Sequence, residues 1–159
     1  MKKILILFAH PAFERSRTHK RLLQSLQGLD GITFHDLYQV YPKQIIDVQH
    51  EQRLLAEHDE FVLQYPFYWY QPPSLLKEWM DLVLQYGWAY GAEGKALRGK
   101  HLHVAITAGG GERSYSDDGI HGHDVDVFLR PLERTASVCG MSWGRPFVVH
   151  DATHMTDMA

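Results

Sequence analysis

Residues 3–9, KILILFA, decide the fold class of this 159-residue chain. Every residue from Ile4 to Ala9 is apolar, with no polar side chain between them. A strand covered on one face alternates apolar and polar residues, whereas a strand buried on both faces is a continuous apolar run. The stretch therefore predicts an inner strand of a parallel sheet that is covered by helices on both faces.

The rest of the chain alternates between strand-like and helix-like segments. Further strands are expected at 32–37 (ITFHDL), 60–66 (EFVLQYP), 101–107 (HLHVAIT) and 145–150 (RPFVVH). Apolar residues at helical spacing predict helices over 18–29, 48–58, 72 to about 86, and 124–138. This alternation, without repeats or linkers, predicts an α/β fold with a five-stranded parallel sheet in a single domain over residues 1–159.

Composition excludes several classes of function. The formal net charge is −3 and the Lys and Arg residues are scattered, which leaves no basic face for nucleic acid. Cys139 is the only cysteine, so no intrachain disulfide can form. The apolar start of the chain is too short for a signal peptide, and no apolar run is long enough to cross a bilayer. We expect a soluble cytoplasmic protein.

Ligands of open parallel sheets bind beyond the carboxyl ends of the strands, so the loops after the first, third and fourth strands carry the functional argument. The first, AHPAFERSRTHK, leads into the start of a helix, where free N–H groups favour an anion. Ser16, Arg17, Thr18 and His19 add donors there, and His10 sits at the strand end. A phosphate site fits, and so does a simple helix cap with solvated cations.

The second loop places Phe67, Tyr68, Trp69 and Tyr70 in a row behind Pro66. Successive side chains of an extended segment face opposite ways, so these four rings cannot all enter one core. The exposed rings are suited to stacking on a planar heterocycle. A subunit interface would explain them equally well.

The third loop, TAGGGERSYSDDGIHGHD at 107–124, contains three consecutive glycines. Glycines let a ligand approach the main chain and leave the N–H groups as donors. His121, His123 and Asp124 are too closely spaced, and lack a second cluster, to predict a metal site. His101 and His103 share one face of the fourth strand and are expected to pack or to reach solvent.

An ordered set of motifs resembles the flavodoxin-like NAD(P)H:quinone oxidoreductases, in particular the ancillary quinone-reductase subunits of glutathione-gated potassium-efflux systems. The matching stretches are ILILFAHP followed by Ser16, DLYQVYPKQIID, QYPFYWYQPPSLLKEWMDLVLQYGWAYG, ALRGKHL, ITAGGGERSYSDDGIHG and CGMSWGRPFVVH. Together they extend over nearly the whole chain. The resemblance implies a doubly wound sheet with the strand order 2-1-3-4-5.

The resemblance also implies a non-covalent flavin, either FMN or FAD. The residues implied to hold its phosphate are His10, Ser16, Arg17, Thr18 and His19. Those implied to contact its ring are Pro66, Phe67, Tyr68, Trp69, Tyr70, Thr107, Ala108, Gly109 and Gly110. Tyr115 and His121 match the tyrosine and histidine that hydrogen-bond the reduced flavin, and are expected to be catalytic.

As in the resembled family, NADPH or NADH is expected to reduce the flavin, leave, and be replaced by a quinone, which gives ping-pong kinetics. The family works as a homodimer, and the segment with Trp88, Tyr90 and Gly91 is expected to complete the partner's site. This sequence departs from the family at His19, usually Asn, and at Ala108, usually Thr. It also ends where the family has one further helix, so the sequence is clipped or this face is left to a partner.

Two other functions compete with a quinone reductase. The first is a regulatory subunit that docks on a membrane potassium-efflux transporter, at the inner face of the membrane, with secondary or no catalysis. The second is a one-electron carrier of the flavodoxin type. The long aromatic loops and the lack of a strongly acidic surface disfavour the carrier.

Overall fold

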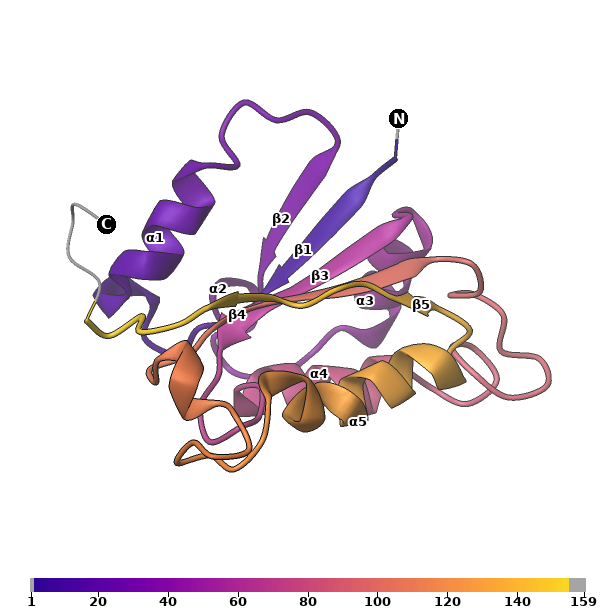
Figure 1. Ribbon diagram of the computed structural model, residues 1–159. Helices are drawn as coiled ribbons and strands as arrows, with labels where there is room; N and C mark the ends of the chain where they lie inside the picture. Colours follow the sequence, from indigo (N-terminus) through magenta and orange to yellow (C-terminus); the bar gives the residue numbers. More distant parts are fainter. Residues whose placement is uncertain (1, 155–159) are drawn as a thin grey trace.

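The computed structural model describes residues 2–154 and contains one parallel sheet (Figure 1). Its strands are β1 (Ile4–Phe8), β2 (Ile32–Asp36), β3 (Glu60–Pro66), β4 (His101–Thr107), β5 (Ser142–Trp143) and β6 (Phe147–Val149). The order is β2-β1-β3-β4-β5, and β6 also pairs with β4. The predicted order of a flavodoxin-like sheet is confirmed, with the last strand divided in two.

Helices lie on both sides of the sheet, as predicted (Figure 1). They are α1 (Arg17–Gln24), α2 (Leu37–Val40), α3 (Val48–Ala56), α4 (Ser74–Val83) and α5 (Val125–Val138). On one side, Leu55 of α3, Trp79 of α4 and Leu129 of α5 belong to the same buried cluster as Leu5 and Leu63 of the sheet. This side holds the main hydrophobic core.

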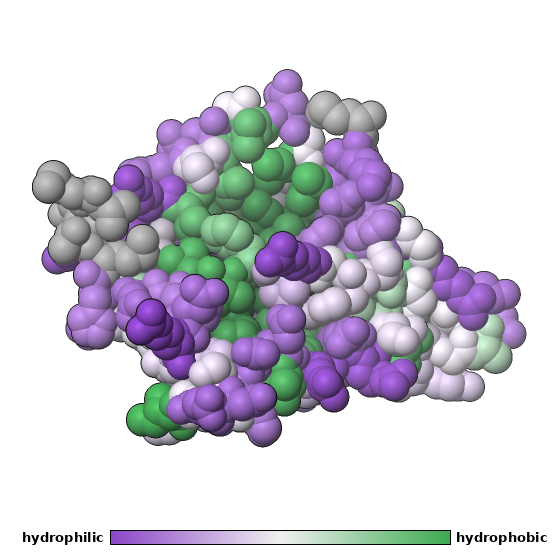
Figure 2. All heavy atoms as spheres, viewed as in Figure 1, coloured by the Kyte–Doolittle hydropathy of each residue, from purple (hydrophilic) through white to green (hydrophobic). Residues whose placement is uncertain are grey.

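The other side of the sheet is covered by α1 over part of its area only. Phe34 of β2 and Phe147 of β6 remain 42% and 54% exposed. In register they pair with Ile6 and Ala105, which places them on the same side of the sheet as one another. Figure 2 shows the apolar area that results beside α1.

Several predicted bounds are wrong, each for a local reason. The first helix ends at Gln24 and not at 29, because the following residues form tight turns such as Gln27 N–H to Gln24 C=O. The helix expected to start at residue 72 begins at Ser74, because the backbone of Pro73 is extended, with ψ of 151°, and its side chain cannot accept a capping hydrogen bond. Helix α2 was not predicted, although the Asp36 side chain caps it through two N–H groups.

A buried carboxylate ties α3 to its neighbours on the core side. Glu51 has no exposed surface, and it accepts hydrogen bonds from His35 Nε2 at 2.8 Å, Tyr41 OH at 2.5 Å and Trp79 Nε1 at 2.8 Å. Burial alone would raise the pKa of Glu51, but these bonds outweigh it and hold the pKa below its usual value. One side chain thus links β2, the α2–α3 loop, α3 and α4.

We expect Glu51→Gln to lower the free energy of unfolding by about 2 kcal/mol, because its amide NH₂ cannot accept one of these three bonds and leaves a buried donor unpaired. Urea unfolding of the variant and the parent measures the difference. Glu57→Gln, an exposed glutamate at the end of the same helix, is the matched control. An equal loss of stability in both variants would contradict the role given to the buried network.

Candidate functional site

A cleft of about 940 Å³ opens at the carboxyl edge of the sheet. Pro66 of β3 pairs in register with Thr107 of β4, so the loops that follow these strands leave the sheet side by side. The lining residues are His10, Ala12, Arg15, Ser16, Arg17, Thr18, Pro66, Phe67, Tyr68, Trp69, Thr107, Gly109, Ala152 and Thr153. All three loops singled out in the sequence therefore contribute to one cleft large enough for a cofactor.

The start of α1 gives this cleft an electropositive side. Ser16 caps the helix, and its Oγ accepts from the backbone N–H of His19 at 3.2 Å. Arg15 and Arg17 line the cleft on either side of the cap. A helix N-terminus with two guanidinium groups beside it favours a phosphate or another anion.

His10 lines the cleft as a neutral donor. Its Nδ1 accepts from the backbone N–H of Ala12 at 3.1 Å, which places the ring proton on Nε2. Burial is the main cause that lowers the pKa of His10 below its usual value. The side chain can therefore offer one N–H to a ligand without carrying a charge.

His19 lies beneath the cleft, where its side chain cannot meet a ligand. It has no exposed surface, and its ring bonds Thr107 Oγ1 at 3.0 Å and Gln64 Nε2 at 3.3 Å. Burial, helped by the neighbouring His10, lowers the pKa of His19 to about 3. The His19 ring packs α1 against the sheet and bonds Thr107. Its backbone N–H donates to Ser16 Oγ.

The second loop divides its four rings as the sequence predicts. Phe67 is buried, Tyr68 and Trp69 line the cleft, and Tyr70 turns toward Phe128, with the two rings stacked 4.7 Å apart. Trp69 is 89% exposed. It and Tyr70 both have left-handed backbones, with φ of 49° and 65°, in a turn closed by Gln71 N–H to Tyr68 C=O at 3.1 Å.

Such a turn normally carries Asn or Gly, and a bulky residue held in this conformation costs about 1–3 kcal/mol. The turn is what presents the Trp69 ring to solvent at the mouth of the cleft, while Tyr70 reaches the third loop. Backbone strain is thus concentrated at the candidate site.

The third loop packs on itself around Tyr115 and His121. Their rings stack with centroids 4.1 Å apart, and Tyr70 OH lies 3.1 Å from His121 Nδ1. Tyr115 is 8% exposed, and burial raises its pKa. Thr107 and Gly109 line the cleft, whereas Ala108, Gly110, Tyr70, Tyr115 and His121 lie beside it and outside its lining.

The glycines of this loop offer unused donors. Within residues 2–154, no hydrogen bond is donated by the backbone N–H groups of Gly109, Gly110 or Gly111. The main chain around them is held in place by Ala108 N–H to Val149 C=O at 2.8 Å and Asp151 N–H to Gly110 C=O at 3.1 Å. These bonds hold the loop without using the N–H groups of its three glycines.

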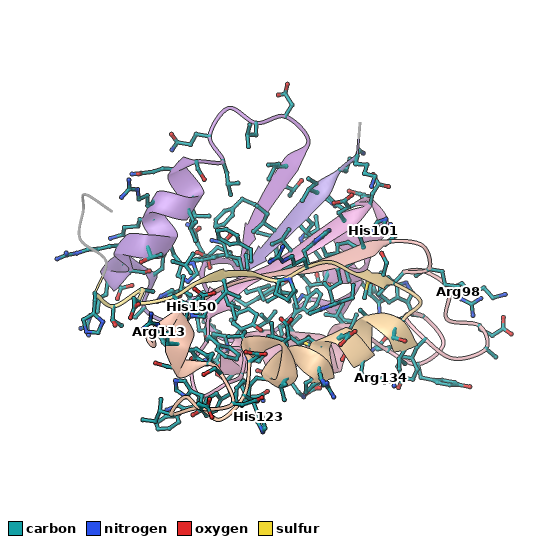
Figure 3. All side chains as sticks on the ribbon, viewed as in Figure 1. Arg98, His101, Arg113, His123, Arg134 and His150 are labelled. Atoms are coloured by element: carbon teal, nitrogen blue, oxygen red, sulfur yellow. The ribbon has the colours of Figure 1, made fainter. Side chains whose placement is uncertain are left out.

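The histidines weighed in the sequence as metal ligands, together with His101 and His103, do not line the cleft. His123 is exposed and faces Asp117 at 3.9 Å, whereas His101 lies at the amino end of β4, at the other end of the molecule from His150 and Arg113 (Figure 3). No group of His, Cys, Asp or Glu in the described part of the chain is arranged to hold a metal. None of the helices between residues 2 and 154 is long and apolar enough to span a membrane.

Sequence reasoning missed four residues of the cleft lining, Ala12, Arg15, Ala152 and Thr153. Arg15 could have been predicted, since it lies beside Ser16 in the first loop. Ala152 and Thr153 follow the last strand, and their position depends on long-range bonds such as Ala152 N–H to Ala108 C=O at 3.0 Å. No local pattern predicts such a contact.

The fold and the cleft together define the class of the protein. The family described as having a flavodoxin-like fold matches residues 2–159, and the chain belongs to that family. The resemblance expected from the motifs is confirmed.

Individual relatives are similar over most of their length. The glutathione-regulated potassium-efflux system ancillary protein KefG of Pectobacterium atrosepticum is 48% identical over 96% of this chain and 84% of its own. General stress protein 14 of Treponema denticola, solved in complex with FMN, is 45% identical with a TM-score of 0.91, covering 93% of this chain and 86% of that one. An NADPH-quinone reductase from P. pentosaceus is 29% identical with a TM-score of 0.89, covering 98% and 89%.

The missing side chain of Gly110 leaves the room that the stacked rings of Tyr115 and His121 occupy. A Cβ at this position would lie 3.1 Å from His121 Nε2 and 3.4 Å from Tyr115 Cε2. We expect Gly110→Ala to push the two rings apart and to change the ring-current shifts of the His121 protons in the NMR spectrum. Gly109→Ala is the control, because its Cβ would meet nothing closer than Thr153 Cγ2 at 3.7 Å. Equal shifts in both variants would refute this role of Gly110.

Proposed function

We propose that this chain is an FMN-dependent NAD(P)H:quinone oxidoreductase. The observation that carries the proposal is the cleft, which combines an anion-binding helix start with exposed rings and free backbone donors. The FMN complex of general stress protein 14 and the NADPH-quinone reductase support it, since both are similar to this chain over most of its length.

The residues present fit FMN at both of its ends. Arg15, Arg17 and the Ser16-capped helix would hold the phosphate. Trp69, Tyr68 and Gly109 would flank the ring, with Thr107 at its edge. When bound, FMN supplies a ring that takes a hydride from NADPH or NADH and passes it to a quinone, in two half-reactions that follow one another at the same face.

Tyr115 and His121 would balance the negative charge that develops when hydride reaches the ring. If Tyr70 OH donates to His121 Nδ1, the imidazole proton is held on Nε2, the atom nearest to Gly110. The stacked pair and the glycine N–H groups would then form a set of preorganised donors within the third loop.

We further propose that the enzyme is a homodimer. Tyr86 is 72% exposed and Tyr90 36%, and their rings meet edge to face at 5.7 Å on the loop after α4. Gly91 makes room for Tyr86, because a Cβ there would lie 2.6 Å from its ring. This exposed aromatic surface supports the expectation that the segment with Trp88, Tyr90 and Gly91 contacts a second subunit.

A second candidate function is that of an ancillary subunit of a potassium-efflux transporter. The 48% identity to KefG supports it, and the two functions can coexist in one protein. Co-purification with a transporter and restored ion flux would support this function, and absence of binding to any membrane component would refute it.

The proposed reaction is tested by absorption spectroscopy. We expect the purified chain to bind FMN, the flavin bands to bleach when NADPH or NADH is added without oxygen, and a quinone to restore them. A chain that takes up no added FMN, or bound FMN that neither pyridine nucleotide reduces, would refute the proposal.

Tyr115→Phe and His121→Gln should each slow flavin reduction about 100-fold in stopped-flow measurements, because Phe has no hydroxyl donor and the flexible Gln side chain does not hold its N–H at the place of the imidazole proton. His123→Gln, which changes an exposed histidine of the same loop, should leave the rate unaltered. Unchanged rates in both Tyr115→Phe and His121→Gln would remove the catalytic roles of these residues.

A further inference from the structure

A chain of three buried polar side chains runs beneath the cleft from β3 to β4. Gln64 Nε2 lies 3.3 Å from His19 Nδ1, and His19 Nε2 lies 3.0 Å from Thr107 Oγ1. Gln64 is 4% exposed, His19 has no exposed surface, and Thr107 is 7% exposed. Of these three hydrogen-bonded residues, only Thr107 also lines the cleft.

The proton positions along this chain follow from the chemistry of each group. As oriented, the Gln64 amide presents its nitrogen to His19 and donates, so Nδ1 of His19 is the acceptor and carries no proton. A neutral imidazole has one ring proton, which is then on Nε2 and is donated to Thr107 Oγ1.

The neutral state of His19 follows from its surroundings. Among the described residues, no carboxylate bonds its ring, and the titratable group that faces it is His10, with ring centroids 5.0 Å apart. Burial and this second imidazole both disfavour a charge, which agrees with a pKa of about 3 for His19.

Thr107 Oγ1 already accepts a hydrogen bond from His19, so its own hydroxyl proton needs an acceptor elsewhere. Among residues 2–154, Oγ1 has no hydrogen-bond partner other than His19. The residue ends β4 at the cleft, and the direction left open to its O–H is toward a bound ligand.

We propose that Thr107 is a binding residue that donates its hydroxyl proton to the ligand, and that Gln64 and His19 are positioning residues that fix this direction. The ligand must then present an acceptor at this point, a ring nitrogen or a carbonyl oxygen of a planar heterocycle. A ligand with an N–H group there would leave the Thr107 hydroxyl proton without an acceptor and would bind more weakly. The inference rests on the proposed function for the identity of this heterocycle as FMN.

The first test concerns His19 alone and needs no ligand. In the ¹⁵N NMR spectrum of the flavin-free protein, with His19 assigned by comparison with His19→Asn, we expect a protonated Nε2 and an unprotonated Nδ1. Both signals should stay unchanged from pH 8 to pH 5. A proton on Nδ1, or titration of His19 within this range, would overturn the proposed chain.

The second test measures FMN affinity by quenching of flavin fluorescence. Thr107→Val keeps the shape of the side chain but removes the hydroxyl, and should weaken binding about ten-fold. Thr107→Ser retains the hydroxyl and should bind like the parent. Equal affinities for the Val and Ser variants would overturn the role of Thr107. Failure of the parent to bind FMN would instead refute the proposed function, while the His19 spectrum would still test the buried chain.

Discussion

The parallel pairing of β3 with β4 is the constraint on which the candidate site depends. These strands pair from Glu60–His101 to Pro66–Thr107, and both are covered by the main core on one side. Because parallel strands end at the same edge, the aromatic loop and the glycine loop leave the sheet together. Phe67 N–H to Thr107 C=O at 2.9 Å continues this pairing one step beyond the strands.

Helix α1 brings the third component to this edge, and a neutral histidine makes its position possible. His19 packs against the sheet without a charge to be solvated, and its ring bonds join the helix to both β3 and β4. The Ser16 cap and the flanking arginines are thereby placed beside the ends of the strands. Packing, rather than surface charge alone, thus places this helix start at the cleft.

Much of this arrangement could be predicted from local pattern, because β1 is a continuous apolar run, β3 and β4 are short segments rich in apolar residues, and the loops that follow them carry unusual residues. The strand order came from resemblance of motifs and not from periodicity. Local pattern could not show that His19 turns away from the cleft, or that Tyr70 reaches His121, because both depend on which helix covers which strand. The early end of α1 and the unpredicted helix α2 were decided by turn and cap hydrogen bonds. The contribution of Ala152 and Thr153 depends on a contact with residue 108, far away in the sequence.

The central claim is that one cleft at the carboxyl edge of the sheet binds FMN. A titration with FMN followed by ¹H–¹⁵N NMR tests it most directly, because each backbone amide and the Trp69 indole report separately. The predicted result is that the perturbed signals come from residues 10–18, 66–70 and 107–111, while those of Asp59 and Lys100 at the amino edge stay unchanged. Perturbations at the amino edge, or none at these three loops at saturating FMN, would contradict the claim.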